Sequence, residues 1–91
     1  MSGDVARRHR DAGGLDVAAR AVLEFLEPLD VPVCVRTVGL NVGVDSATAR
    51  AACHRLRALG LVAAGTPDGR GYVITSRGED YLAGNLGLAA P

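Results

Sequence analysis

The 91-residue sequence contains no lysine and no tryptophan, and it has only three aromatic residues and two histidines. With so few aromatic side chains, a core must be built from valine, leucine and alanine. No apolar run reaches the roughly 18 residues that a membrane span needs, and no apolar segment follows Met1 as in a signal peptide. We therefore expect a cytoplasmic protein without a membrane partner.

Signatures of catalysis are also missing from the sequence. It has no glycine-rich phosphate loop, no HExxH metal motif and no GxSxG nucleophile motif. The two cysteines, Cys34 and Cys53, form no CxxC pair, and no cluster of metal-ligand residues surrounds them. A chain this short has room for one core and little else. We therefore expect no enzyme, no metal, no cofactor and no small-molecule substrate.

The charges balance in total but are unevenly distributed along the chain. Ten arginines match ten acidic residues, so the formal net charge is zero. Three arginines and one aspartate make residues 1–10 net +2, and four arginines and one aspartate make residues 31–57 net +3. Residues 11–30 hold one arginine and five acidic residues, which is net −4. A neutral total can therefore conceal a basic face that attracts nucleic acid.

The spacing of apolar residues predicts helices and one β-hairpin. Over residues 15–27 and 45–59, apolar residues recur every three or four positions, which is the period of a helix. The other expected elements are a short β-like connection over 29–35, a short helix over 35–41, hairpin strands over 61–64 and 72–75 with a tip over 65–71, and a last helix from Ser76.

Residues with special backbone or capping roles mark the ends of these helices. Asp16 and Asp45 are of the type favoured as N-caps. Asn41 or Gly43 can adopt the left-handed conformation of a turn, and Gly60 can end the long central helix. The four residues from Ser76 to Glu79 have the S-x-x-E form of a capping box.

Two apolar stripes indicate which helix faces are buried. The stripe of the first helix is expected at Ala18, Ala21, Val22, Phe25 and Leu26. That of the long central helix is expected at Ala49, Ala52, Cys53, Leu56 and Leu59. Cys53 is thus predicted to be a small core residue, and Cys34 to pack beside Val33 just before a helix.

The order of these elements is typical of a winged helix-turn-helix, in which a short glycine-containing turn joins two central helices. The predicted fold class is therefore mainly α with a small β-hairpin. We expect a flexible basic arm over residues 1–14, the winged helix-turn-helix domain over 15–84 and a C-terminal tail over 85–91. The first and last helices, or the arm, would form the contact of a homodimer.

A helix-turn-helix reads DNA with the exposed face at the start of its second helix, which lies in the major groove. Small residues there allow close approach, and Arg50 suits a bidentate contact with guanine. Arg36, at a helix start, and Arg70, at the hairpin tip, suit the phosphate backbone. The predicted DNA-binding residues are Arg36, Thr37, Ser46, Ala47, Thr48, Arg50, His54, Arg55 and Arg70.

Four segments resemble the haloarchaeal phage-repressor-like winged helix-turn-helix DNA-binding proteins. They are residues 39–42, 53–56, 60–62 and 71–84, the last of which carries the strand Gly-Tyr-Val-Ile-Thr and the helix start Ser-Arg-Gly-Glu. The resemblance extends over roughly residues 15–84. It implies an archaeal DNA-binding repressor of proviruses or plasmids, with a reading face made of Ser46, Ala47, Thr48 and Arg50.

These observations favour a sequence-specific transcription regulator, a repressor, that binds double-stranded DNA as a homodimer. An alternative is a winged-helix protein-interaction module that binds no DNA, which the zero net charge favours and the arginines of residues 36–57 oppose. A third hypothesis is a repressor that responds to a ligand or to oxidation through Cys34, Cys53 and His54. Against it, Cys53 and His54 are adjacent on one helix, so their side chains diverge by about 100°.

Overall fold

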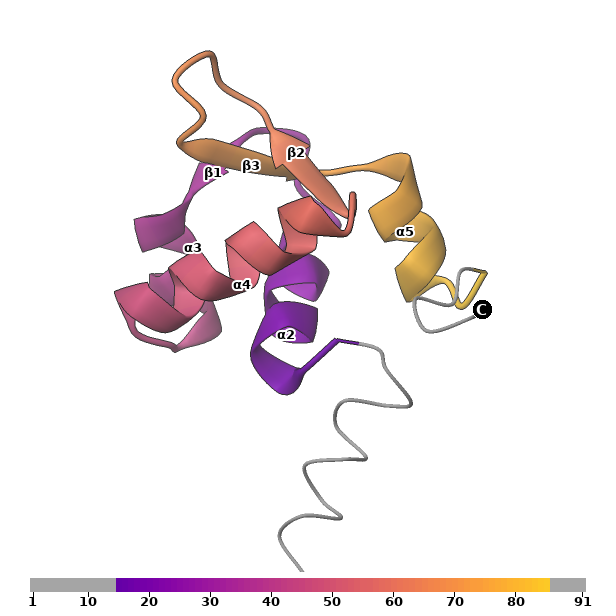
Figure 1. Ribbon diagram of the computed structural model, residues 1–91, viewed down its shortest axis with the longest axis horizontal. Coiled ribbons are helices and arrows are strands. Elements are labelled where there is room, and N and C mark those ends of the chain that lie inside the picture. Colours follow the sequence, from indigo (N-terminus) through magenta and orange to yellow (C-terminus); the bar gives the residue numbers. More distant parts are fainter. Residues whose placement is uncertain (1–14, 86–91) are drawn as a thin grey trace, which may run out of the picture.

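In the computed structural model, the elements follow one another in the predicted order (Figure 1). The structure describes residues 15–85, so the expected arm over residues 1–14 and the tail beyond residue 85 lie outside the described residues. The elements are α2 (Val17–Leu26), β1 (Val33–Cys34), α3 (Val35–Val42), α4 (Ser46–Ala58), β2 (Val62–Ala64), β3 (Gly71–Ile74) and α5 (Ser76–Leu82). The mainly helical class and the winged helix-turn-helix architecture are confirmed.

The short stretch with β character expected over residues 29–35 forms β1, and it joins the predicted hairpin in a three-stranded sheet. Its order is β1-β3-β2, with both pairs antiparallel, and Tyr72 of β3 pairs with Val33 on one side and Ala64 on the other. Only two residues of the β-like connection over 29–35 join the sheet, because Pro32 cannot donate to a ladder and α3 begins at Val35. Because β1 directly precedes α3, its pairing with β3 holds the start of α3 against the sheet.

Glycines allow the segment before β1 to lie close to the hairpin. A Cβ atom on Gly65 or on Gly71 would stand 2.8 Å from the ring of Pro32. Such contacts are too short for any side chain, so both positions require glycine for steric reasons. The loop between β2 and β3 projects from the helices in Figure 1, and we call it the wing. Its base is thereby packed against Pro32.

The core lies between α2, α3, α4 and the sheet. The predicted stripe of α4 is confirmed, since Ala49, Ala52, Cys53 and Leu56 are buried and Leu59 is half-buried. The face of α2 is rotated from the prediction: Ala19, Val22, Leu23 and Leu26 are buried, whereas Ala18, Ala21 and Phe25 are only half-buried. Residues 21–23, 25 and 26 are all apolar, so spacing alone could not define the centre of the stripe.

Three capping interactions mark the ends of α2 and of the two helices of the helix-turn-helix, α3 and α4. The Asp16 carboxylate accepts a hydrogen bond of 2.8 Å from the Ala19 N–H at the start of α2. The Asp45 carboxylate accepts one of 2.7 Å from the Thr48 N–H at the start of α4. Gly43 ends α3 with a φ of 86°, a left-handed conformation that glycine adopts without strain. The predicted caps at both aspartates and the predicted turn are confirmed.

The expected capping box at the start of α5 is wrong by one residue. Thr75 is the N-cap, and its hydroxyl accepts a hydrogen bond of 3.1 Å from the Gly78 N–H. The same hydroxyl donates to the Gly60 carbonyl at 2.7 Å, just beyond the end of α4. Ser76 is instead the first helical residue. Thr75 rather than Ser76 caps the helix because its hydroxyl also binds the Gly60 carbonyl. The S-x-x-E pattern could not indicate that contact, since Gly60 is distant in the sequence.

No helix within residues 15–85 has both the length and the apolar character needed to cross a lipid bilayer.

Candidate nucleic-acid interface

The exposed surface of α4 has two flanks and a ridge of small side chains. Because successive residues of a helix are about 100° apart, Arg50 and His54 lie on one flank and Thr48 and Arg55 on the other. Each pair lines a different hollow of the surface, which agrees with this division. Ala47 and Ala51, which are both exposed, lie between the flanks.

The first flank borders a hollow of about 560 Å³ between the start of α3, the middle of α4 and the wing. Three arginines and a histidine contribute to its lining. The lining residues are Cys34, Val35, Arg36, Arg50, His54, Gly69, Arg70 and Tyr72. We call this surface the basic hollow.

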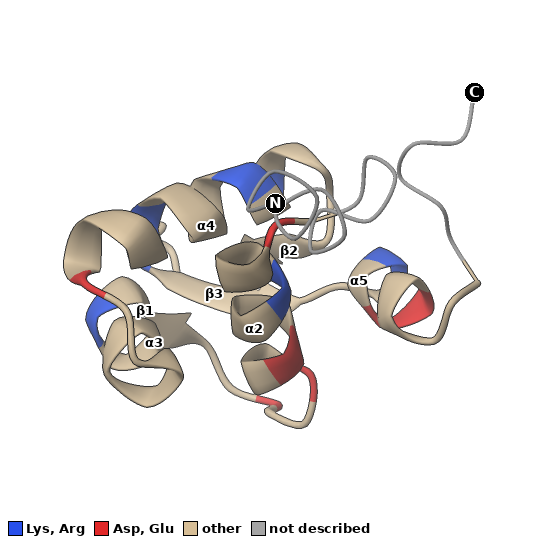
Figure 2. Cartoon of the chain, turned by 90° about the horizontal axis from the view of Figure 1, so that it is seen from below, with Lys and Arg blue, Asp and Glu red and all other residues tan. Residues whose placement is uncertain are grey.

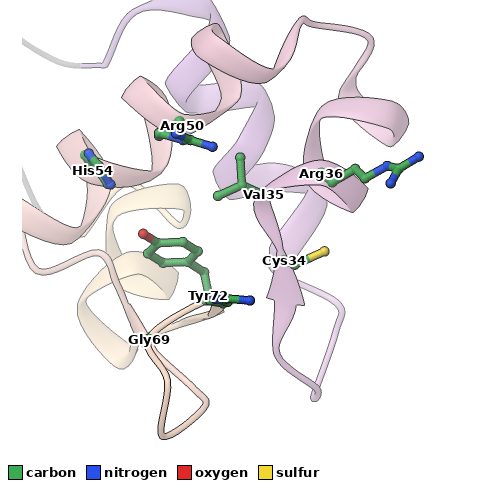
Figure 3. Close-up of a pocket in the computed structure, with 8 residues that line it drawn as sticks. Cys34, Val35, Arg36, Arg50, His54, Gly69 and Tyr72 are labelled. Atoms are coloured by element: carbon green, nitrogen blue, oxygen red, sulfur yellow. The ribbon is translucent and has the colours of Figure 1, made fainter.

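The close-up view shows how the side chains lie around the basic hollow (Figure 3). Arg50 and His54 project from α4, and the hydroxyl end of Tyr72 points toward that helix. The side chain of Arg36 extends away from α4, so its guanidinium lies at the rim. Tyr72 is only 4% exposed, and its ring therefore forms a firm floor between the wing and α4.

The wing tip is ordered by its own hydrogen bonds. The Thr66 hydroxyl donates to the Asp68 carboxylate at 2.6 Å, and the Arg70 N–H donates to the same carboxylate at 3.0 Å. These bonds, that from Thr66 first, lower the pKa of Asp68. The Gly71 N–H donates in turn to the Thr66 hydroxyl at 3.0 Å. This network fixes the backbone that carries Arg70 at the edge of the basic hollow.

The guanidinium groups on this side of the molecule are available for an acidic partner. Among residues 15–85, the only ion pair is Arg20 with Glu24, at 3.0 Å, on α2. Arg77 donates to the Leu59 carbonyl at 2.9 Å. The arginines that have no ion pair with a carboxylate of residues 15–85 and no side-chain hydrogen bond within them are Arg36, Arg50, Arg55, Arg57 and Arg70.

The acidic residues gather elsewhere. Apart from Asp68 in the wing tip and Asp16 at the start of α2, they mark the C-terminal end of α2, the turn that follows it, and α5, whereas α3 and α4 carry only basic charges beyond the Asp45 cap (Figure 2). The local field around the basic hollow is therefore positive although the chain as a whole is neutral. This separation of charge is what the uneven distribution along the sequence predicted.

The structure divides the nine predicted DNA-binding residues into three groups. Those that line the basic hollow are Arg36, Arg50, His54 and Arg70. Those that line the hollow on the other flank of α4 are Ala47, Thr48 and Arg55. Thr37 and Ser46 are exposed but line neither hollow, and the Thr37 hydroxyl lies 3.3 Å from the Cys34 sulfur.

Sequence reasoning missed several residues of this surface. Tyr72 and Gly69 reach the basic hollow through the sheet and the wing, and Cys34 and Val35 reach it because β1 pairs with β3. No local pattern could indicate that pairing. Arg57, seven residues after Arg50, lies on the same flank of α4 but lines neither hollow.

The two cysteines lie in contrasting surroundings. Cys53 is buried, as predicted for a core residue, and burial raises the pKa of its thiol to about 11. Cys34 directly precedes α3, as predicted, but it is exposed at the N-cap, so the expectation that it packs beside Val33 is wrong. The hydrogen bond with the Thr37 side chain lowers the pKa of Cys34. No group of three or more potential metal ligands occurs within residues 15–85.

The fold has a counterpart among solved structures. It is similar to the crystal structure of the multiple antibiotic-resistance repressor (MarR) from Listeria monocytogenes, with a TM-score of 0.68 and 19% sequence identity. The alignment covers 97% of this chain and 56% of the repressor, so the chain spans little more than half of that protein's length. No model of a protein family matches the sequence, and no protein of curated function matches it. The similarity establishes a winged-helix fold of the kind found in that repressor.

Proposed function

We propose that the chain is a transcription regulator that binds double-stranded DNA, with α4 in the major groove and the wing against the backbone. The observation that carries this proposal is the basic hollow, where Arg36, Arg50, His54 and Arg70 gather between α4 and the wing. The small ridge of α4, at Ala47 and Ala51, would let the helix approach the base edges closely.

The proposed contacts differ in what they contribute. Arg50, in the first half of the exposed face of α4, is the candidate for a bidentate contact with a guanine. Arg36 and Arg70 lie at the rim and on the wing, where they would bind phosphates of the flanking backbone. Phosphate contacts release counterions and therefore give affinity that falls with salt, whereas base contacts give sequence preference.

We further propose that the regulator is a sequence-specific repressor that acts in the cytoplasm as a homodimer. The similar structure is that of a repressor, and the resemblance to haloarchaeal phage-repressor-like proteins favours the same role in an archaeal virus or provirus. A two-fold dimer would bind half-sites one helical turn apart, about 10 bp, or a multiple of that spacing.

A selection from a pool of mixed duplex DNA tests the proposal. The expected result is enrichment of a palindromic site, bound more tightly than random duplex and with a steep dependence on salt. On the selected site, Arg50→Ala should cost ~1–3 kcal/mol and relax the preference at one position. Arg36→Ala and Arg70→Ala should weaken binding to all sequences and reduce the salt slope by about 1 each.

A matched control is Arg20→Ala, which removes the same charge from α2, where Arg20 is paired with Glu24. This variant should bind DNA as the wild type does. An absence of binding even at about 50 mM salt, where phosphate contacts are strongest, would overturn the proposal and favour the protein-interaction module. Equal losses on selected and random DNA for Arg50→Ala would refute its role as the base-reading residue.

A further inference from the structure

The hydroxyl of Tyr72 is a polar group without a partner among residues 15–85. The side chain is only 4% exposed, and its hydroxyl end points toward α4 in the basic hollow (Figure 3). The hydroxyl of the chain's other tyrosine, Tyr81, instead accepts a hydrogen bond from the Leu15 N–H at 3.2 Å. Within the described part of the chain, no fully buried side-chain oxygen or nitrogen lacks a partner. The Tyr72 oxygen therefore keeps an opening to the hollow that it lines, where a ligand can reach it.

The sheet holds this hydroxyl in a fixed position. Tyr72 belongs to β3, the central strand, and pairs with Val33 of β1 on one side and Ala64 of β2 on the other. Its ring is part of the core cluster. A side chain that is already immobilised loses little further conformational freedom when a ligand binds to it. The hydroxyl is thus a preorganised contact, unlike the long arginine side chains around it.

The lining around the hydroxyl is rich in cations. It contains three arginines and a histidine but no carboxylate. Guanidinium groups only donate hydrogen bonds, and Arg36, Arg50 and Arg70 form no ion pair with residues 15–85. Asp68 on the wing tip accepts hydrogen bonds from within the wing itself. A ligand that accepts a bond from the Tyr72 hydroxyl and is attracted by the surrounding cations is an oxyanion.

The position of the basic hollow indicates where such an oxyanion would come from. The hollow lies between α4 and the wing. If α4 enters the major groove and the wing lies against the backbone, the sugar-phosphate strand that borders this groove passes over the hollow. Base edges lie inside the groove and face α4, so the group that the strand presents to the hollow is a phosphate. Tyrosine is among the side chains that bind DNA phosphates in this way.

We propose that one phosphate of the DNA backbone binds in the basic hollow on the hydroxyl of Tyr72. This inference rests on the proposed function and extends it. The Tyr72 O–H donates to a phosphate oxygen, with His54 of α4 and Arg70 of the wing on the sides of the hollow, and Arg50 is left for the base edges. Because every nucleotide carries the same phosphate, this contact fixes how deeply α4 lies in the groove and gives no sequence preference of its own.

A free oxyanion is the competing occupant of the basic hollow. A hollow of about 560 Å³ is within the range of small-molecule sites, about 300–1,000 Å³, and inorganic phosphate offers the same acceptor oxygens as DNA. The hollow is open toward both α4 and the wing, the two elements proposed to contact the duplex. This shared exposure favours the phosphate of the duplex.

The two tyrosines of the chain provide a matched pair of variants. Tyr72→Phe keeps the buried ring and removes an oxygen that has no partner among residues 15–85, so the unfolding temperature should not fall. Affinity should fall about tenfold, as expected for a hydrogen bond to a charged group, and equally for the selected and a random duplex. Tyr81→Phe removes the acceptor of the Leu15 N–H. It should lower the unfolding temperature and leave DNA affinity unchanged.

The dependence on salt separates the hydroxyl from the arginines. A neutral hydroxyl displaces no counterion, so Tyr72→Phe should keep the wild-type slope of log affinity against log salt, whereas Arg70→Ala should make it shallower. Interference by ethylated phosphates on the selected duplex locates the contact. One phosphate in each half-site should interfere with the wild type and much less with Tyr72→Phe. A methylphosphonate at that phosphate should reduce the difference in affinity between the two proteins, because it weakens the acceptor.

Failure of this inference is distinguishable from failure of the proposed function. Wild-type affinity of Tyr72→Phe for both duplexes, alongside weaker binding by Arg70→Ala, would overturn the role of the hydroxyl and leave the regulator intact. A loss confined to the selected duplex would show that the hydroxyl binds a base, and would overturn the phosphate contact.

Inorganic phosphate, compared with chloride at equal ionic strength, is the probe for a free anion. If Tyr72→Phe binds DNA normally but resists a displacement by inorganic phosphate that the wild type shows, the hollow binds a free oxyanion and the inference is overturned. If the wild type binds no duplex even at about 50 mM salt, the proposed function fails and this inference fails with it.

Discussion

Gly39 of α3 lies directly against Ala49 of α4: a Cβ atom on Gly39 would stand 3.4 Å from that of Ala49 and 3.1 Å from the Val44 carbonyl oxygen. Both residues are buried. The absence of a side chain at Gly39 sets the separation of the two central helices, and hence the position of the exposed face of α4. A glycine within a helix lowers its propensity by about 1 kcal/mol relative to alanine, and this contact explains its presence.

Replacing Gly39 by valine should destabilise the protein. A branched side chain has no room beside Ala49, and overpacking of this kind costs about 1–3 kcal/mol. Gly39→Ala should be much milder, because a gain of about 1 kcal/mol in helix propensity offsets a contact that Val44 must relieve by a small shift. Unfolding in urea measures the stability of both variants relative to the wild type. Leu40→Ala, at a position 76% exposed on the same helix, serves as the control and should change little. A valine variant as stable as the wild type would contradict the close contact.

The hydroxyl of Thr75 should matter more than that of Ser76. Thr75→Ala removes both the acceptor for the Gly78 N–H and the donor to the Gly60 carbonyl, and loss of such a cap costs about 0.5–2 kcal/mol. Thr75→Ser keeps the hydroxyl and should lose less. Thermal unfolding of these variants beside Ser76→Ala, at an exposed position, provides the comparison. A larger loss for Ser76→Ala would restore the capping box expected from the sequence.

The two thiols should react at very different rates. Only the thiolate is nucleophilic. With a pKa of about 11, Cys53 would be about one part in a thousand thiolate at pH 8, and it is also buried. Cys34 is exposed, with a pKa lowered by its hydrogen bond with Thr37. Iodoacetamide followed by mass spectrometry should therefore find Cys34 modified first in the native protein.

Modification of Cys34 also tests the basic hollow, since this residue is part of its lining. If DNA binds there, a bulky maleimide adduct on Cys34 should weaken binding, and Cys34→Ser should bind normally and resist the reagent. Unchanged binding by the fully modified protein would place the DNA elsewhere and would also remove the redox hypothesis for this cysteine. In urea, Cys53 should become reactive as the core unfolds.

The hydrogen-bonded carboxylates at the start of α4 and in the wing should make the stability of the protein depend on pH in the acid range. The pKa of Asp45 is lowered from its usual 3.8 by the hydrogen bond from Thr48, and that of Asp68 by the bond from Thr66. A carboxyl whose pKa is lower in the folded state contributes stability that is fully present above its usual pKa and is lost as the pH falls through the folded value. Below about pH 4, the melting temperature should therefore fall less steeply in Asp45→Asn and Asp68→Asn than in the wild type. If the melting temperature of all three proteins changes in parallel from pH 3 to 6, the lowered pKa values of both carboxyls are contradicted.

Local rules were sufficient for the parts of the fold that depend on near neighbours. The N-caps at Asp16 and Asp45, the left-handed turn at Gly43 and the buried face of α4 are all short-range features. So is the choice of Arg50, because its exposure follows from the period of a single helix. The sequence also indicated that a neutral chain would carry a basic face, since its charges are separated along the chain.

Only the tertiary structure decided how these parts meet. The pairing of Val33 with Tyr72, the rotated face of α2 and the cap at Thr75 all depend on contacts between distant segments. The same contacts divide the predicted DNA-binding residues between the two hollows, and bring the start of α2 beside Arg55. By itself the sequence determined the elements, their order and the residue types of the site. Their arrangement in space required the packing of the whole chain, because side chains far apart in sequence compete for the same buried volume and only one arrangement fills it.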